Sequence, residues 1–402
     1  MQTNISKPQV LVDPAHDRAV GVSFRRAGRD YDVLASKEVI VSAGVVESPK
    51  LLMLSGIGPA DELRRLGLST CLKGATESKR TKLFDDDAQW TSSPSNFALT
   101  SNYALTSSQI HVSKDLPGVG KNMRSHVGAG GIYFTTSQPV GMSLFRDLTI
   151  RSLASYAFRG GGQLNSPGGL EGIAFISSNY STDPTWPDVE ILFGSTHIAS
   201  DGGLVYRRLL NLTEEVWETY RDLRWRDGFM MLPFPTRPKS RGQIRLRSAN
   251  PEEDPEIIGN YFKHPEDMQI TVDAIKFLMK IAETPAMKEV GAELYAHTLP
   301  GCEQHTRFSD AYWECHTRHF TYLHWHDSST CQMGPEYNPE TVVDSRLRVH
   351  GINSLRVADA SIMPEIVSGD TQAACIMIGE KAASMIKEDH QLLTARSRLL
   401  RI

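Results

Sequence analysis

The alternation of apolar and polar positions is clearest near the C-terminus. Two runs with strand-like alternation, VVDSRLRV (342–349) and SLRVAD (354–359), are separated by a His-Gly-Ile-Asn turn. Turn-forming residues therefore lie at both ends of a strand pair. Because α/β proteins bind ligands at the ends of their strands, this pattern predicts a ligand site.

The segment that follows, 371–387, has apolar residues at helical spacing. We expect a helix, and its buried side is predicted to include Ile376, Met377, Ala383 and Ile386.

The first forty residues alternate short apolar runs with turns: QVLVD, AVGVSF, YDVLA and EVIVSAG. They predict a small antiparallel ribbon that leads into a buried strand over 39–41. A helix is expected next, with Ser48 as its N-cap and Pro49 at its first position, and a second helix over 60–66. The small residues Ala43 and Gly44, at the strand-to-helix turn, would let a dinucleotide approach the backbone.

The residue pattern in the middle of the chain predicts an α+β arrangement. IYFTT, GIAFISS and VEILFGSTHIAS predict strands, and 209–223 predicts a helix. After residue 235 we expect a strand in GQIRLRS and an amphipathic helix over 267–282.

Three C-terminal blocks share a wider pattern: HDSSTCQMGP, VVDSRLRVHGINSLRVADASIMP and SGDTQAACIMIGEKAASMI. In order and spacing they resemble the glucose–methanol–choline (GMC) family of FAD-dependent oxidoreductases. AGVVESPKLLMLSGIG (43–58) and VSKDLPGVGKNMRSHVGAGG (112–131) resemble two further segments of that family. Blocks that agree in register are far more specific than one short motif.

The resemblance implies an α/β fold with an α+β substrate domain. Residues 1–130 would belong to an incomplete, Rossmann-like FAD-binding domain. Residues 131–334 would form mainly an antiparallel-sheet substrate domain, with the family's C-terminal region beginning near 235. Residues 335–392 would return to the FAD-binding domain. The Ser/Thr-rich stretch 71–111 has no counterpart in the family, and we interpret it as a disordered insertion.

The resemblance also implies the activity, which is oxidation of the CH–OH group of an alcohol or sugar with hydride transfer to FAD. His326 would be the general base, because a neutral imidazole can take the hydroxyl proton. Asp370 stands at the second active-site position. The residues expected to contact the cofactor are Ala43, Gly44, Ser48, Pro49, Asn122, Asp359, Ala360 and Gln372.

Asp370 departs from the family, which has His or Asn at this position, and Gln372 replaces a second Asn. A carboxylate beside a reduced, anionic flavin adds like charge. Three interpretations stay open: Asp370 is protonated by desolvation, it acts as the base with His326 as its partner, or the site is weak or inactive. We expect Asp370→Asn to raise the rate.

The sequence contains no G-x-G-x-x-G turn after an N-terminal strand, which is the family's pyrophosphate site. The chain therefore reads as a truncated FAD enzyme, and we expect the purified protein to be colourless. The alternative is a non-catalytic remnant that acts as a binding or structural protein.

Charge and composition limit the kinds of binding partner that we expect. With a net charge of −4, the chain gives no reason to expect nucleic acid, and no apolar run reaches the roughly 18 residues that span a bilayer. No metal site is expected, because His316, His319, His324, His326 and Cys331 lack acidic or cysteine partners at settled spacing. Cys302 and Cys315 could form a disulfide if the protein is exported by a signal peptide upstream of this sequence. The electron acceptor is not predicted.

Overall fold

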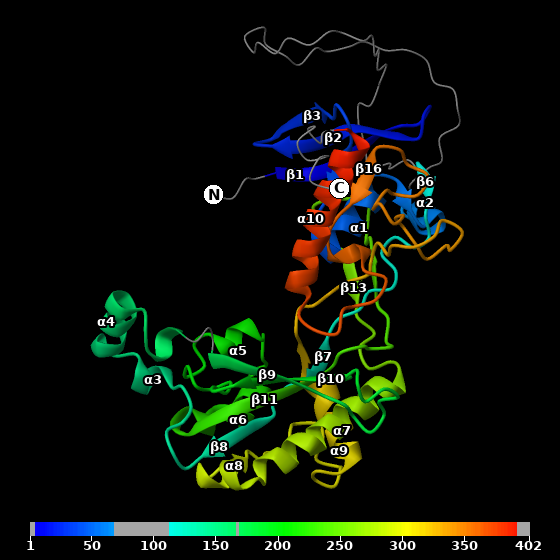
Figure 1. The fold of residues 1–402 in the computed structure, drawn as a ribbon. Helices are drawn as coiled ribbons and strands as arrows, with labels where there is room; N and C mark the ends of the chain where they lie inside the picture. The colour runs from blue at the N-terminus through cyan, green and yellow to red at the C-terminus, as the bar shows by residue number, and fades with distance from the viewer. Residues whose placement is uncertain (1–4, 68–111, 166–168, 392–402) are drawn as a thin grey trace, which may run out of the picture.

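The computed structural model describes residues 5–67, 112–165 and 169–391, which form two bodies joined by a narrow middle (Figure 1). The N-terminal strands and the C-terminal helix lie together in the upper body, and the middle of the chain forms the lower body (Figure 1). The predicted insertion at 71–111 lies outside the described residues. None of the described helices is long and apolar enough to cross a membrane.

The upper body begins with the predicted antiparallel ribbon. Strands β1 (Ile5–Asp13), β2 (Arg18–Arg26) and β3 (Arg29–Leu34) form a sheet in the order β1-β2-β3. All of its pairs are antiparallel, as the alternation of apolar runs and turns predicted.

The predicted buried strand over 39–41 is confirmed as β4 (Val39–Val41), in which the two valines are buried. It pairs in parallel with β16 (Leu355–Val357), with Val41 opposite Val357. The run 342–349, predicted as a strand, makes only isolated bridges in the structure. The reason is local: the Asp344 carboxylate accepts the backbone N–H groups of Arg346 and Arg348, which turns the chain.

The helix after β4 begins earlier than predicted. Helix α1 (Gly44–Leu54) starts at Gly44, so Ser48 and Pro49 lie inside it and Ser48 is not its N-cap. Pro49 has no N–H to offer to the carbonyl of Val45. The Thr330 hydroxyl donates to that carbonyl instead, at 2.6 Å, and this bond ties α1 to the segment that follows His326. The second helix is confirmed as α2 (Ala60–Arg65).

The C-terminal helix is confirmed as α10 (Thr371–Asp389), but its buried side differs from the prediction. Ile376 and Met377 are 62% and 57% exposed, whereas Ile378 and Ala382 are buried. Ile378 and Ala382 belong to the core around β4 and β16. At 100° per residue, a helix that turns these two inward must turn Ile376 outward.

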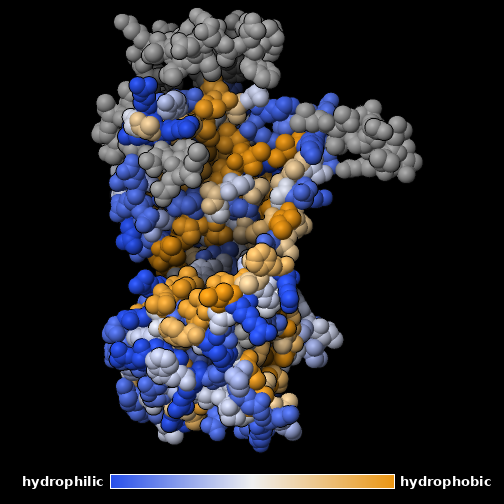
Figure 2. Space-filling model, turned by 90° about the vertical axis from the view of Figure 1, so that its left-hand side faces the viewer, coloured by the Kyte–Doolittle hydropathy of each residue, from blue (hydrophilic) through white to orange (hydrophobic). Residues whose placement is uncertain are grey.

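Figure 2 shows apolar side chains gathered along the hollow between the two bodies.

The lower body is built on a five-stranded antiparallel sheet in the order β14-β8-β11-β10-β9. Its strands are β8 (Tyr133–Thr136), β9 (Leu170–Ile176), β10 (Val189–Gly194), β11 (Asp227–Pro235) and β14 (Glu293–Leu294). The central strand β11 was not predicted, because its run GFMMLPFP is continuously apolar and contains prolines.

Helices cover both faces of this sheet. Helix α7 (Pro265–Ala282), which confirms the predicted 267–282, packs on one face through Met268, Ile275 and Leu278. Helix α6 (Glu214–Tyr220) and the 3-10 turn η3 (Arg221–Trp225) pack on the other face.

Short elements complete the chain: β5 (Ile57–Gly58), β6 (Lys114–Asp115), β7 (Val127–Ala129), β12 (Gln243–Arg245), β13 (Glu256–Ile258), β15 (Thr321–Leu323), α3 (Leu144–Asp147), α4 (Ile150–Arg159), η1 (Gln163–Asn165), α5 (Tyr206–Leu209), α8 (Pro285–Glu289), α9 (Asp310–His319) and η4 (Ala360–Ile362).

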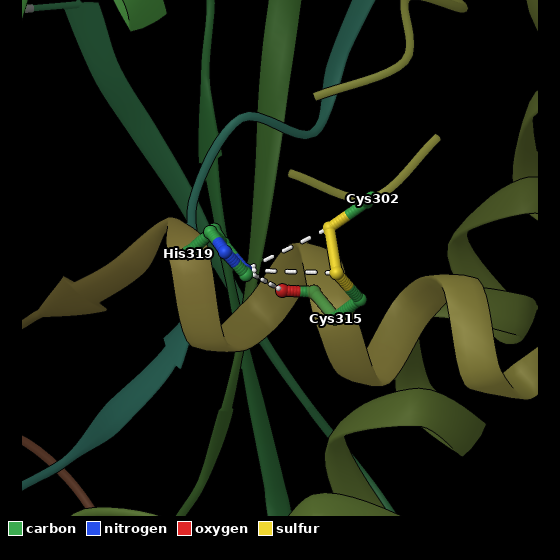
Figure 3. A group of neighbouring side chains, drawn as sticks. All are labelled: Cys302, Cys315 and His319. Carbon is green, nitrogen blue, oxygen red and sulfur yellow. Dashed lines mark hydrogen bonds between the residues drawn. A yellow bond between two sulfur atoms is a disulfide. The ribbon is translucent and has the colours of Figure 1, made fainter. Parts of the chain in front are cut away.

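A disulfide joins Cys302 to Cys315 on α9 (Figure 3). The imidazole of His319 lies beside it, and its Nδ1 donates to the carbonyl of Cys315 at 2.9 Å. Cys331 and Cys375 are free cysteines.

Candidate active site

The turn after β4 and the end of β16 meet through Asp359. One carboxylate oxygen of Asp359 accepts the N–H of Gly44 at 3.0 Å and the hydroxyl of Ser48 at 2.6 Å. The other oxygen accepts the N–H of Ser361 at 2.8 Å. The two strands are parallel and in register. Their carboxyl ends therefore lie at the same edge of the sheet.

The strand-to-helix turn at this edge is open at Gly44. Gly44 has φ of +85°, and a Cβ placed on it would meet no atom within 4 Å. A side chain would therefore enter open space at the strand-to-helix turn, where a cofactor approaches the backbone. The predicted contacts Ala43, Gly44, Ser48, Asp359 and Ala360 come together at this edge.

Other predicted contacts lie around the same edge. Asn122 is in the left-handed region, with φ of +61°, and its amide donates to Gln332 at 3.0 Å. Pro49 is buried within α1. Gln372 is exposed in the first turn of α10.

Backbone hydrogen bonds connect this edge to the segment that contains His326. The N–H of Ser329 donates to the carbonyl of Ala360 at 3.2 Å, and Ser328 exchanges backbone bonds with Arg124. His326 lies just before these serines, so the predicted base is placed beside the predicted cofactor edge.

His326 has an imidazole partner that sequence reasoning missed. Its Nδ1 lies 2.9 Å from Nδ1 of His126, and Nε2 of His126 lies 2.9 Å from the carbonyl oxygen of Thr236. His126 is fully buried, and burial together with the nearby His326 lowers its pKa to about 4. His126 is therefore neutral at pH 7.

The tautomers of both rings follow from the Thr236 carbonyl, which can only accept. His126 must carry its proton on Nε2, so its Nδ1 accepts from Nδ1–H of His326. Burial lowers the pKa of His326, although the charge of Asp370 acts in the opposite direction. The neutral His326 is thus left with a lone pair on Nε2.

Asp370 faces that lone pair. Its Oδ1 lies 3.4 Å from Nε2 of His326, and its side chain is 53% exposed. Asp370 is the N-cap residue of α10, yet its side chain makes no capping hydrogen bond. The carboxylate is therefore available to the imidazole.

Two more ionisable groups complete the cluster. The ring of His324 stacks against that of His326, with centroids 4.1 Å apart, and burial lowers the pKa of His324 to about 4. Glu190 on β10 is fully buried, and neither carboxylate oxygen has a hydrogen-bond partner among the described residues. Burial, and then the charge of Asp370, raise the pKa of Glu190 to about 7.

Sequence signals for these residues were weak. His126 lies in the segment 112–131, which resembles a family motif, and this was its only signal. Glu190 sits in an apolar strand run, where a lone acidic residue at an inward position was the available clue.

Comparison with known protein families gives two matches. Residues 1–128 and residues 238–379 match the N-terminal and C-terminal profiles of one family, each described as GMC oxidoreductase.

Curated relatives agree with this assignment. The chain is 33% identical to "Glucose dehydrogenase [FAD, quinone]" of Drosophila melanogaster over 96% of its length, which covers 52% of that protein. It is 31% identical to "Choline dehydrogenase, mitochondrial" of Homo sapiens over 92% of its length, which covers 51% of that protein. The chain thus spans about half the length of these relatives.

Solved structures share the fold. Formate oxidase from Aspergillus oryzae superposes with a TM-score of 0.72 at 24% identity, covering 97% of this chain and 61% of that one. A fungal aryl-alcohol oxidase gives a TM-score of 0.67 at 21% identity, covering 95% and 60%.

Proposed function

Because the chain belongs to the GMC oxidoreductase family, we propose that it takes part in the FAD-dependent oxidation of the CH–OH group of an alcohol or sugar, with His326 as the general base. The observation that carries the proposal is the lone pair on Nε2 of His326, which the contacts of His126 and Thr236 fix in place.

The base works by accepting the hydroxyl proton of the substrate. An alcohol carbon gives up hydride more readily as its oxygen loses a proton, so a neutral imidazole within hydrogen-bond reach lowers the barrier. His326 is neutral at pH 7 because burial lowers its pKa. Its Nδ1–H stays bonded to His126, so the incoming proton goes to Nε2.

Asp370 acts on the protonated state of the base. Once Nε2 carries a proton, it can donate to Oδ1 of Asp370, which lies 3.4 Å away. This ion pair stabilises the imidazolium. The same negative charge opposes negative charge that develops on a nearby cofactor, so Asp370 has two opposite effects.

The residues at the carboxyl ends of β4 and β16 would hold the flavin end of FAD, with Ala43, Gly44, Asn122 and Ala360 supplying backbone and amide contacts. Bound FAD would accept the hydride from the substrate carbon.

We propose an oxidising compartment for this protein, because disulfides persist in secreted and extracellular proteins and are rare in the cytosol. The disulfide between Cys302 and Cys315 supports this proposal.

The test is alcohol- and sugar-dependent reduction of an artificial electron acceptor by protein supplied with excess FAD. His326→Gln should lower kcat by about 10²–10⁴-fold, the usual contribution of a general base. His16→Gln is the matched control, because that ring is exposed and contacts only the nearby Asp13. Full activity in His326→Gln would refute the assignment of the base. If the protein retains no flavin absorbance after unbound FAD has been removed, the cofactor assignment is refuted.

A further inference from the structure

The cluster around His326 has the composition of a metal site. One ring nitrogen each from His324 and His326 and one carboxylate oxygen of Asp370 lie within 4.8 Å of one another. Two imidazoles and a carboxylate are ligands that zinc prefers, and three protein ligands with an open fourth position are typical of reactive zinc sites. The acidic partner that the histidine-rich stretch lacks in sequence is supplied by Asp370.

We infer that His324, His326 and Asp370 bind a zinc ion. The inference does not depend on the proposed oxidation, because it concerns only the side chains of this cluster.

The spacing of two of the ligand atoms fits a tetrahedral ion. Nε2 of His326 and Oδ1 of Asp370 are 3.4 Å apart. Two atoms bound to one tetrahedral zinc at about 2.0–2.1 Å lie roughly 3.3 Å from each other. An ion between them therefore requires little movement of either side chain.

The orientation of His326 is set in advance. Ligating histidines usually donate their other ring N–H to a neighbouring acceptor, which fixes the tautomer and the direction of the ring. His326 does this through Nδ1–H, which donates to His126. Because His126 is held in turn by the Thr236 carbonyl, the Nε2 lone pair of His326 is directed toward Asp370.

His324 has capacity for a further contact. Its Nδ1 is buried and lacks a hydrogen-bond partner among the described residues. Its ring packs between Phe234 and His326, with centroid distances of 4.7 Å and 4.1 Å. Packing on both faces limits rotation of the ring, which favours a defined ligand geometry.

The local charge also favours a cation. The Asp370 carboxylate is half exposed and makes no capping hydrogen bond, so it is available to a cation. A dication bound to Asp370 would offset the charge of this carboxylate.

Isothermal titration of the oxidised protein with zinc chloride, without reductant, flavin or substrate, tests the inference. We expect one zinc per chain. His326→Ala and Asp370→Ala should each weaken binding by at least 10–100-fold, the range known for loss of even an indirect contact. Asp370→Ala should fold normally, because the side chain is half exposed and makes no capping bond.

The control variant is His319→Ala. Cys302, Cys315 and His319 form the other cluster of possible metal ligands among the described residues, and its two sulfurs are joined in the disulfide (Figure 3). Zinc affinity should be unchanged in this variant. Absence of binding, wild-type affinity in Asp370→Ala or in His326→Ala, or loss of binding in His319→Ala would overturn the inference. None of these outcomes bears on alcohol oxidation, which is measured separately with FAD.

Discussion

His126 and His326, which are 200 positions apart in sequence, face each other through their Nδ1 atoms at 2.9 Å. Only one of these two nitrogens can carry the shared proton. The Thr236 carbonyl decides which, because it requires the proton of His126 to be on Nε2. The predicted base is therefore held in its reactive tautomer by a residue that need not touch the substrate.

The first prediction concerns His126 as a positioning residue. His126→Leu removes the acceptor for Nδ1–H of His326, so the ring can turn or change tautomer, and kcat should fall by about 10–100-fold. His126→Asn keeps one acceptor and one donor and should restore part of the loss. Steady-state kinetics of both variants check this, with circular dichroism to monitor folding. Equal losses in the two variants would show a purely structural role.

The second prediction is a pH dependence. His326 accepts a proton only when it is neutral, and burial lowers its pKa below the usual 6.5. The value of kcat/KM should therefore be constant near pH 7 and should decrease as the pH falls through a value below 6.5. A pH profile measured with one substrate at constant ionic strength checks this. A limb that begins above pH 7 would contradict the assignment.

The third prediction concerns Asp370→Asn. The charge of Asp370 raises the pKa of His326 against the larger effect of burial, so its removal should move the acid limb of kcat/KM to lower pH. On the plateau, the rate should rise, because a negative charge beside the cofactor site is lost. A limb that stays in place would show that Asp370 does not interact with His326. A lower plateau rate would mean that stabilisation of the imidazolium outweighs repulsion.

The fourth prediction concerns stability. Arg356 on β16 is buried and forms ion pairs with Glu38 at 2.7 Å and with Asp389, at the end of α10, at 2.6 Å. Arg356→Ala leaves the buried Glu38 without this cation, and breaking such a pair costs about 3–5 kcal/mol of unfolding free energy. Chemical denaturation measures the loss.

Arg25→Ala provides the matched control for Arg356→Ala. Arg25 pairs with Asp30 on the exposed ribbon, so its loss should change stability much less than the loss of Arg356. Equal effects of the two substitutions would contradict the importance of burial.

The sequence pattern predicted a helix or strand well where one face of that element is buried and the other is exposed to solvent. The ribbon β1–β3 and helices α2 and α7 are examples, because their periodicity reflects a single packing partner. Two predictions failed where a side chain overrides the pattern. Asp344 turns the run 342–349 by binding backbone N–H groups. Ser48 is bonded to Asp359 instead of capping a helix.

The motif blocks likewise identified the family, because they depend on residue order alone. They indicated His326 and Asp370 as candidate site residues, and the structure brings these two side chains to 3.4 Å. They did not indicate Glu190, whose role depends on which side of β10 faces the cluster.

The sequence by itself therefore determined the local elements, the family and the candidate base, because each depends on residues that are close together in the sequence. Only the tertiary structure decided the tautomer of His326, the approach of Asp370 and the burial of Glu190. These depend on where separate segments dock and on the directions of individual hydrogen bonds, which no local periodicity contains.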